Sequence, residues 1–273
     1  MDSMQLRIDD EQSRLAVQDN ELIRSAYTMT LVEKRLLLHA ISKIDSHTLP
    51  RDGQNIYVEI TAKQWKNLYN TPQPWRDLKN ASRKLMNRQV TINPTATNTL
   101  VMNWIDSTEY TSDVVKISFG NKVSQYLTGM LSKFTQIDLL DVAKFDSVYT
   151  VRLYELLRQV EQKEVSDNWL KITVDEFRAV FDLGNKYDRF SYLNQRVLTP
   201  SVKELNIKSD WDITLKTIKK GRAVHMLYFE FSPKAQGELF AEVVQEKSDK
   251  VNKSRESRAK ITAAIMDIGD TNW

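Results

Sequence analysis

The feature that most constrains the fold of this chain is an internal repeat. A short amphipathic helix begins after Thr61, with Gln64 three residues later, and the same arrangement returns 112 residues further on at Thr173 and Glu176. A threonine three residues before a glutamine or glutamate is the capping-box pattern of a helix start. In both places a second amphipathic helix and alternating strands follow. The repeat therefore predicts two similar domains.

The first copy is predicted to cover residues 20–133. It opens with a helix that begins at a third capping box, Thr30 with Glu33, and ends near Asp45. The further elements expected are a short helix within Ile60–Tyr69, a helix at 75–88, and strands at Ile56–Ile60, Gln89–Asn93, Leu100–Tyr110 and Asp113–Phe119. Three helices followed by a twisted hairpin form a winged helix-turn-helix.

The helix at residues 75–88 has a basic outer face. Trp75, Leu78 and Leu85 form its apolar side. The segment holds five basic residues and one acidic residue, a net charge of +4. Its candidate DNA-binding residues are Arg76, Lys79, Asn80 and Arg83.

The second copy is predicted to cover residues 134–233 in the same order. Helices are expected at Ser147–Val160, 173–181 and Asp188–Asn206, and strands at Trp211–Ile218 and Val224–Phe231. Lys219, Lys220 and Arg222 form a basic tip between the two strands and are candidate DNA contacts. The predicted fold class is α+β, with two tandem winged helix-turn-helix domains of similar internal architecture.

The helix at Asp188–Asn206 is the candidate for reading DNA sequence. Its apolar residues recur at helical spacing: Phe190, Leu193, Val197, Val202 and Leu205. The candidate DNA-binding residues on it are Arg189, Ser191, Asn194, Gln195, Arg196, Thr199 and Lys203. Side chains of these types reach base edges and phosphates. Pro200 predicts a kink or break, which leaves open whether Lys203 shares a face with Gln195 and Arg196.

A charged outer face is also what an ordinary surface helix presents. The tandem arrangement is what favours DNA binding, because one chain then contacts the groove at two places about one helical turn apart. The aromatic residues on the apolar faces are predicted to be core residues and not base-stacking platforms. They are Trp65, Trp75, Phe177, Phe181 and Phe190.

Composition excludes several other classes. With 273 residues, 41% hydrophobic and 27% charged, the chain has the profile of a globular cytoplasmic protein, and no apolar run approaches the ~20 residues that span a bilayer. No membrane partner is expected. Zero cysteines and three scattered histidines predict no metal site, and no cofactor or enzymatic activity is expected. The net charge of +3 means that DNA binding must come from local clusters.

The two ends of the chain are predicted to be tails. Residues 1–19 are polar and acidic without helical or strand periodicity, which predicts a mobile tail. Residues 234–273 hold seven basic and seven acidic residues, and Ile261–Ile268 is the segment that suits a short helix. No function is assigned to this polar C-terminal tail.

Several motifs in order resemble the iteron-binding Rep initiators of theta-replicating bacterial plasmids. They are the run Asn20–Ile41, the run Arg152–Leu157, the helix Phe190–Asn206, and the turn Ile218–Arg222 followed by Phe229 and Phe231. The resemblance covers residues 20–233. It implies two winged helices that bind direct repeats at a plasmid origin, help to open adjacent AT-rich DNA, and recruit a host replication initiator and helicase. It also implies dimers that repress their own gene and monomers that initiate.

Three other classes compete with this interpretation. A rolling-circle nuclease is set aside, because no two histidines stand close enough to form the metal-binding pair. A transcriptional repressor would use the same two modules without initiator activity. A partner-binding protein would leave the basic faces unexplained.

A dimer through the first domain is a separate expectation from the residues. The opening segment (Leu22, Ile23, Tyr27, Met29) and the hairpin Leu100–Phe119 offer more apolar side chains than one small module needs. Exposed apolar patches usually mark such interfaces.

Overall fold

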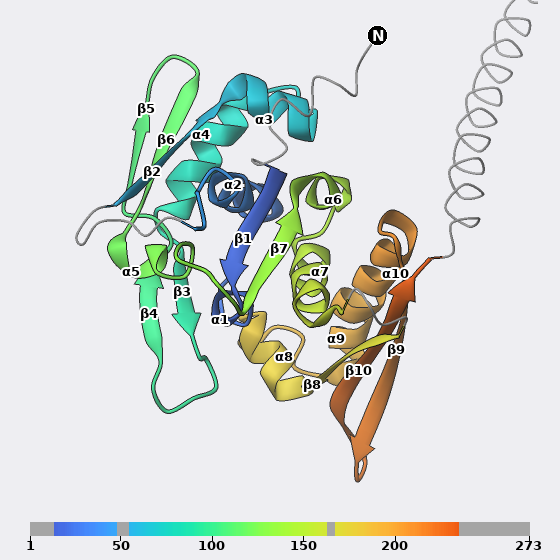
Figure 1. Ribbon diagram of the computed structural model, residues 1–273. Coiled ribbons are helices and arrows are strands. Elements are labelled where there is room, and N and C mark those ends of the chain that lie inside the picture. Colours follow the sequence, from blue (N-terminus) through green and yellow to red (C-terminus); the bar gives the residue numbers. More distant parts are fainter. Residues whose placement is uncertain (1–13, 48–54, 163–166, 235–273) are drawn as a thin grey trace, which may run out of the picture. The chain divides into compact units, whose positions relative to one another are not determined.

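The computed structural model describes residues 14–47, 55–162 and 167–234 (Figure 1). The described residues fall into two compact units, residues 14–209 with 213–232 and residues 210–212 with 233–234. Residues 1–13 and 235–273, with the helix expected at Ile261–Ile268, lie outside the described residues.

Three helices form the first winged helix. They are α2 (Leu31–Ile41), α3 (Ala62–Tyr69) and α4 (Pro74–Leu85). The capping boxes predicted at Thr30 and Thr61 are both present, with Glu33 and Gln64 as the reciprocal partners. Asn70, in the left-handed region at φ 47°, ends α3. A proline then opens α4, where its missing N–H has no intrahelical partner to lose.

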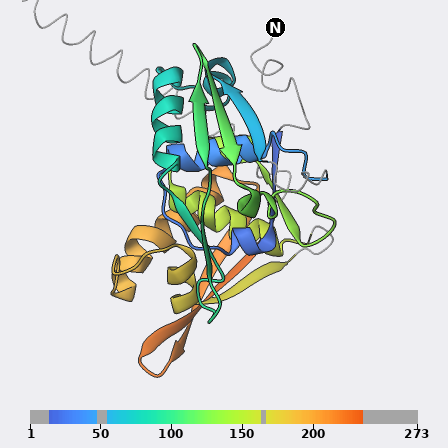
Figure 2. The same ribbon diagram turned by 90° about the vertical axis from the view of Figure 1, so that its left-hand side faces the viewer.

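The wing of this domain is a three-stranded antiparallel sheet in the order β2 (Ile56–Thr61), β6 (Val114–Phe119), β5 (Ser107–Tyr110). Ile60 pairs with Val115 and Val58 with Ile117, and all four side chains are buried. Figure 2 shows α4 lying beside β5 and β6, so the helix and the wing form one surface.

The single strand expected at Leu100–Tyr110 is wrong, because two strands of different sheets occupy that segment. The strand β4 (Leu100–Asn103) pairs with β3 (Gln89–Ile92), whereas β5 pairs with β6. The chain turns between them at Trp104 and Ile105, whose side chains are 0% and 1% exposed. Burial of these two apolar side chains, which local alternation does not reveal, explains the break.

The tail predicted at residues 1–19 is also wrong for its last five residues. They form β1 (Leu15–Asp19), which pairs antiparallel with β7 (Phe134–Asp138). The alternate residues Ala16 and Gln18 are buried, and Arg14 forms an ion pair with Asp138. A strand held by a partner more than a hundred residues away leaves little local signal.

Short helices complete the connections: α1 (Asn20–Ile23), α5 (Asn121–Ser124) and α6 (Leu139–Lys144). The apolar opening segment packs inside this domain, since Leu22, Ile23, Tyr27 and Met29 are at most 5% exposed. Contrary to the expectation from the sequence, these four side chains are therefore not exposed for a dimer interface.

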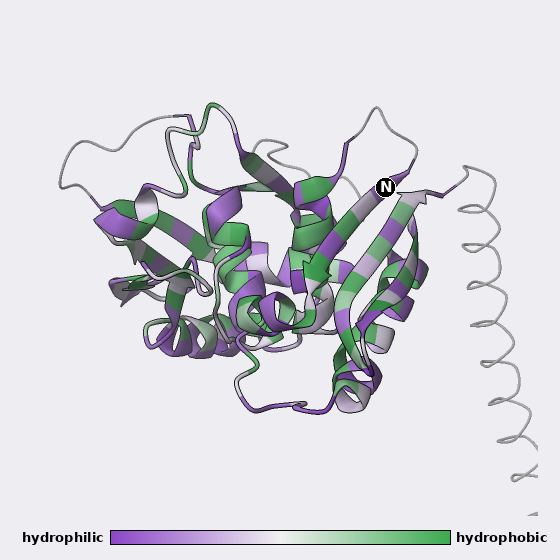
Figure 3. Ribbon diagram, turned by 90° about the horizontal axis from the view of Figure 1, so that it is seen from below, coloured by the Kyte–Doolittle hydropathy of each residue, from purple (hydrophilic) through white to green (hydrophobic). Residues whose placement is uncertain are grey.

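The second winged helix repeats the plan with α7 (Val148–Val160) and α8 (Val174–Val180). Its sheet runs in the order β8 (Asn168–Thr173), β10 (Ala223–Pro233), β9 (Trp211–Lys220). Leu227 of the central strand pairs with Ile172, and both are buried. Figure 3 shows hydrophobic and hydrophilic residues alternating along the strands, the pattern of a half-buried sheet. The aromatic core expected at Trp65, Phe177 and Phe181 is confirmed, whereas Trp75 and Phe190 are only half-buried.

The capping box predicted at Thr173 is only half formed. The side chain of Thr173 accepts a hydrogen bond from the Glu176 N–H at 3.1 Å. The Glu176 carboxylate does not return to the cap, because it pairs with Arg24 of the first domain, with Oε1 3.1 Å from Nη1.

The long helix is continuous through Pro200. It consists of α9 (Phe190–Leu193), a π-helical turn (Asn194–Leu198) and α10 (Thr199–Lys208). The Thr199 N–H bonds to the carbonyl five residues earlier, on Asn194. The wider turn places the proline in the first turn of α10, where it is tolerated. The predicted break is therefore replaced by a π turn, and Ser201 instead of Val202 lies on the buried face.

A buried ionic cluster joins α2 to α7. The Lys34 ammonium lies 2.6 Å from Glu155 Oε1 and 2.6 Å from the Tyr27 hydroxyl, and both lysine and glutamate side chains are 0% exposed. Arg152 donates to Glu155 at 3.0 Å and to the carbonyls of Ser25 and Val180 at 2.9 and 3.3 Å. The Glu155 carboxylate lies between the two cations and compensates their charges, which would be costly to bury without a counter-ion.

Burial sets the pKa values of this cluster. It lowers the pKa of Lys34 from 10.5 to about 8, although Glu155 acts in the opposite sense. It raises the pKa of Tyr27 well above 10. Burial alone would raise the pKa of Glu155, but Lys34 and Arg152 outweigh it and lower that pKa.

Candidate nucleic-acid interface

Helix α4 presents cations on one side of the first winged helix. Arg76, Asn80 and Arg83 are exposed, while Leu78 and Leu85 on the other side are fully buried. Lys79, predicted to face outward, is half-buried. Burial of the apolar side therefore orients the helix so that its charged side faces outward.

The wing residue Tyr110 holds part of this surface in place. Its ring lies 5.4 Å from the Lys79 ammonium and 6.0 Å from the Arg83 guanidinium carbon, distances typical of cation–π contacts. The Tyr110 hydroxyl shares a hydrogen bond with Ser82 at 3.0 Å. Trp75 packs edge-on against Tyr110, and its ring centroid lies 5.8 Å from the Lys79 ammonium.

The long helix of the second domain presents a different set of side chains. Exposed residues recur every three or four positions through the π turn, so Lys203 stays on the exposed side despite Pro200. The exposed candidates are Arg189, Ser191, Gln195, Arg196, Thr199 and Lys203. Asn194 is half-buried, and its side-chain oxygen accepts a hydrogen bond from Thr199 Oγ1 at 3.4 Å.

The start of this helix borders an open hollow of about 440 Å³ that sequence reasoning missed. Tyr192, 51% exposed, lines it together with Arg189 and Arg196. The preceding loop supplies the rest of the lining through Asn185, Tyr187 and Asp188. The sequence gives little sign of this hollow, because a tyrosine at position 192 is equally compatible with an apolar helix face. The signal is the exposure of Tyr192 beside two arginines, which the structure shows.

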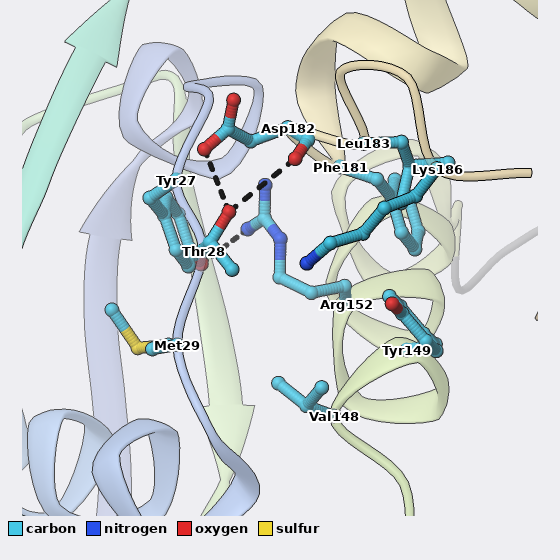
Figure 4. Close-up of a pocket in the computed structure, with 10 residues that line it drawn as sticks. All are labelled: Tyr27, Thr28, Met29, Val148, Tyr149, Arg152, Phe181, Asp182, Leu183 and Lys186. Carbon is cyan, nitrogen blue, oxygen red and sulfur yellow. Dashed lines mark hydrogen bonds between the residues drawn. The ribbon is translucent and has the colours of Figure 1, made fainter.

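Side chains of both domains contact the loop before the helix. The Thr28 hydroxyl donates to the Asp182 carboxylate at 2.6 Å (Figure 4). The Tyr149 ring packs edge-on against Tyr187 at 6.3 Å. Figure 4 shows the side chains of Thr28, Asp182 and Arg152 gathered where the two domains meet.

The far end of the long helix is anchored by polar contacts. Glu204 accepts hydrogen bonds from the Asp146 N–H and the Thr150 hydroxyl, both at 2.5 Å. Asn206 bonds to both backbone groups of Ile213, donating at 2.9 Å and accepting at 2.7 Å. These contacts fix the helix against α7 and β9.

The wing tip of the second domain is basic. Lys219, Lys220 and Arg222 are all exposed, around Gly221 in the left-handed region at φ 64°. No carboxylate in the described part of the chain pairs with any of these three cations. They are therefore available to phosphates.

Within the described residues, no group of three histidine, cysteine, aspartate or glutamate side chains is placed to hold a metal ion. No described helix is long and apolar enough to cross a membrane.

Two winged helices in tandem, each with an exposed polar and cationic helix, define a class of DNA-binding proteins. Comparison with known proteins gives the family. The model of the first domain of initiator replication proteins matches residues 15–158, and the model of their second winged helix matches residues 173–231. The chain belongs to this family of replication initiator proteins.

Individual relatives agree. A replication initiation protein of Escherichia coli is 30% identical over 228 residues, which cover 82% of this chain and 71% of the relative. The PI protein of Escherichia coli is 26% identical over 247 residues, 78% of this chain and 80% of that protein. The crystal structure of the Pi initiator protein in complex with iteron DNA superposes with a TM-score of 0.68 at 21% identity, covering 82% of this chain and 99% of the other.

The tandem winged-helix fold predicted from the sequence is confirmed. The boundary between residues 133 and 134 stays a prediction, and the first family model extends through α7 to residue 158. The DNA contacts of the individual candidate residues also stay predictions.

Proposed function

We propose that this protein initiates plasmid replication by binding direct repeats at the origin through both of its winged helices. The observation that carries the proposal is the pair of exposed helices, α4 and the long helix of the second domain, on one chain of the initiator family. The proposed partner is double-stranded DNA.

The two helices suit different parts of a duplex. The α4 surface carries mainly cations, which act on phosphates without reading sequence. The long helix carries Gln195 and Arg196, side chains that pair with adenine and guanine edges in the major groove. The tip around Lys220 adds phosphate contacts beside it.

Binding to repeats next to the gene tests the proposal. We expect higher affinity for a duplex of about two helical turns carrying these repeats than for a random duplex, with steep salt dependence of about 0.9 in slope per phosphate contact. Equal affinity for both duplexes at every salt concentration contradicts specific recognition. A single inverted repeat as the preferred site would support a repressor instead.

Opening of AT-rich DNA and recruitment of a host replication initiator and helicase belong to the same proposal. They are supported by membership of the initiator family. Permanganate reactivity of unpaired thymines on a supercoiled origin plasmid measures opening. Unchanged reactivity with protein present, together with specific binding, leaves a repressor as the function.

We further propose that the chain exists as both homodimer and monomer. The exposed residues Leu100 and Val101 on β4, 38% and 53% exposed, are apolar and remain available in the first domain. Sedimentation velocity across a concentration range measures the equilibrium. A monomer at every concentration contradicts the dimer.

A further inference from the structure

The loop between α8 and the long helix holds Tyr187 in a backbone conformation that a tyrosine rarely adopts. Asp182 and Tyr187 are both in the left-handed region, at φ 47° and 54°, and Gly184 between them is at φ 49°. Left-handed backbone is uncommon for residues other than glycine, asparagine and aspartate, and Tyr187 is none of these. Such a conformation persists when the surroundings impose it.

One side chain, that of Arg178 on α8, bonds to three carbonyls of this loop. Its Nη1 donates to the Tyr187 carbonyl at 2.7 Å, and its Nη2 donates to the carbonyls of Gly184 and Lys186 at 2.8 and 3.0 Å. A planar guanidinium offers several donors in a fixed fork, so it can hold three carbonyls in one arrangement. Lysine has a single donor atom and cannot reproduce this geometry.

The loop held by Arg178 leads directly into the proposed reading surface. Arg189 follows the loop and caps the long helix, and the hollow beside it is lined by loop residues and by Tyr192 and Arg196. A change in the path of the loop therefore moves the base-reading side chains relative to the rest of the domain. Base recognition depends on that position, whereas attraction to phosphates does not.

We propose that Arg178 is a positioning residue for sequence recognition, which acts by holding the loop from Asp182 to Asp188 and with it the start of the reading helix. The inference rests on the proposed function, because it needs a preferred DNA sequence. Arg178 itself does not contact a base. Its two terminal nitrogens are engaged by the three carbonyls.

Two substitutions separate this role from a phosphate contact. Arg178→Met keeps a long side chain and removes both charge and donors, and Arg178→Lys keeps the charge but loses the fork. The probe is the duplex that the wild-type chain selects from a random library, with an unselected duplex beside it. Arg158→Met is the matched control, since Arg158 is also half-buried and bonds to Glu161 on its own side of α7.

For Arg178→Met we expect at least a tenfold loss of affinity for the selected duplex and less than a threefold loss for the unselected one. Arg178→Lys should lose part of the selectivity while keeping the salt slope of the wild type. Amide hydrogen exchange should rise within the loop 182–189 in both variants and stay unchanged in α7. Arg158→Met should keep the wild-type ratio of the two affinities.

A lysine variant with wild-type selectivity, together with a methionine variant that loses both affinities equally, would show a phosphate contact and overturn the proposal. If Arg178→Met does not fold, Arg178→Lys alone decides, because unchanged selectivity and unchanged loop exchange contradict positioning. Failure of the wild-type chain to select any sequence contradicts the proposed function instead.

Discussion

Helix α4 and the long helix of the second domain occupy equivalent places in two copies of one fold, yet different kinds of contact hold them in position. The side chains of α4 are held by aromatic rings, with the Lys79 ammonium next to both Trp75 and Tyr110. The long helix is held at its two ends by hydrogen bonds, from Arg178 to the loop before it and from the Asn206 side chain to the backbone of Ile213 on β9.

The difference shows what each helix can do. A cation–π contact allows the charged side chain to change rotamer. This freedom is compatible with binding phosphates, because they lie all along the duplex and carry no sequence information. Hydrogen bonds at both ends hold the long helix in one position, and pairing with a base edge depends on that position. The same fold therefore provides one helix for affinity and one for sequence.

The most damaging substitution should be Glu155→Ala, which removes the carboxylate between Lys34 and Arg152. Two buried cations left without a counter-ion cost about 3–5 kcal/mol in the free energy of unfolding. Urea unfolding measures it, and both helices should lose DNA binding together because the cluster joins α2 to α7. Glu109→Ala, at an exposed pair with Lys116, should change stability by less than about 1 kcal/mol. Equal effects of the two substitutions would refute the role of the cluster.

The pH dependence of stability should reveal Lys34. Its pKa is about 8 in the folded chain and 10.5 otherwise, so the unfolded chain binds more protons between these values. The free energy of unfolding therefore rises with pH from about 8, by at most roughly 1.4 kcal/mol per pH unit. Above pH 10 the raised pKa of Tyr27 acts in the opposite direction, because the unfolded chain then loses the phenolic proton first. Lys34→Met should lack the rise, and identical pH profiles would contradict this assignment.

Arg196→Ala should separate the two helices by function. We expect a loss of about 1–3 kcal/mol in binding to the preferred repeat and little change on random duplex, which lowers the ratio of the two affinities. Competition binding with both duplexes measures that ratio. An equal loss on both would assign Arg196 to phosphate and remove the contrast with α4.

The smallest effect is expected at the wing tip. Lys220→Ala should weaken binding to repeat and random duplexes about equally and reduce the salt slope by roughly 0.9, one phosphate contact. Arg83→Ala on α4 should behave in the same way. Titrations at four or more salt concentrations give the slope. If a substitution leaves the salt slope unchanged and alters the ratio of the two affinities, that residue contacts a base instead of a phosphate.

The sequence was sufficient for the order of the main helices of each domain and for the positions where they begin. Local patterns such as the Thr30 and Thr61 capping boxes depend on neighbours three residues apart, so they survive without tertiary information. The alternating strands around Ile60 and Leu227 were recognisable for the same reason.

What the sequence could not show depends on partners distant along the chain. The strand at Leu15–Asp19 exists because β7 pairs with it, and Glu176 leaves its cap because Arg24 reaches it. The exposed side of the reading helix was anticipated, but Arg178 was not, because an arginine in an amphipathic helix resembles any surface cation. Only its three carbonyl partners distinguish it.

The pairing of β1 with β7 has a consequence for how such proteins can be recombined. The segment from Asn20 to Lys133 begins at the end of β1 and ends at the start of β7. Its two ends are close together, because Asp19 lies opposite Phe134 in this strand pair. A segment whose two ends meet in this way can be exchanged as a cassette with that of another initiator, because the graft needs one matched strand pair. The cassette carries Tyr27 and Lys34 with it, so the recipient must supply their partners Glu155 and Arg152, which stay behind on α7.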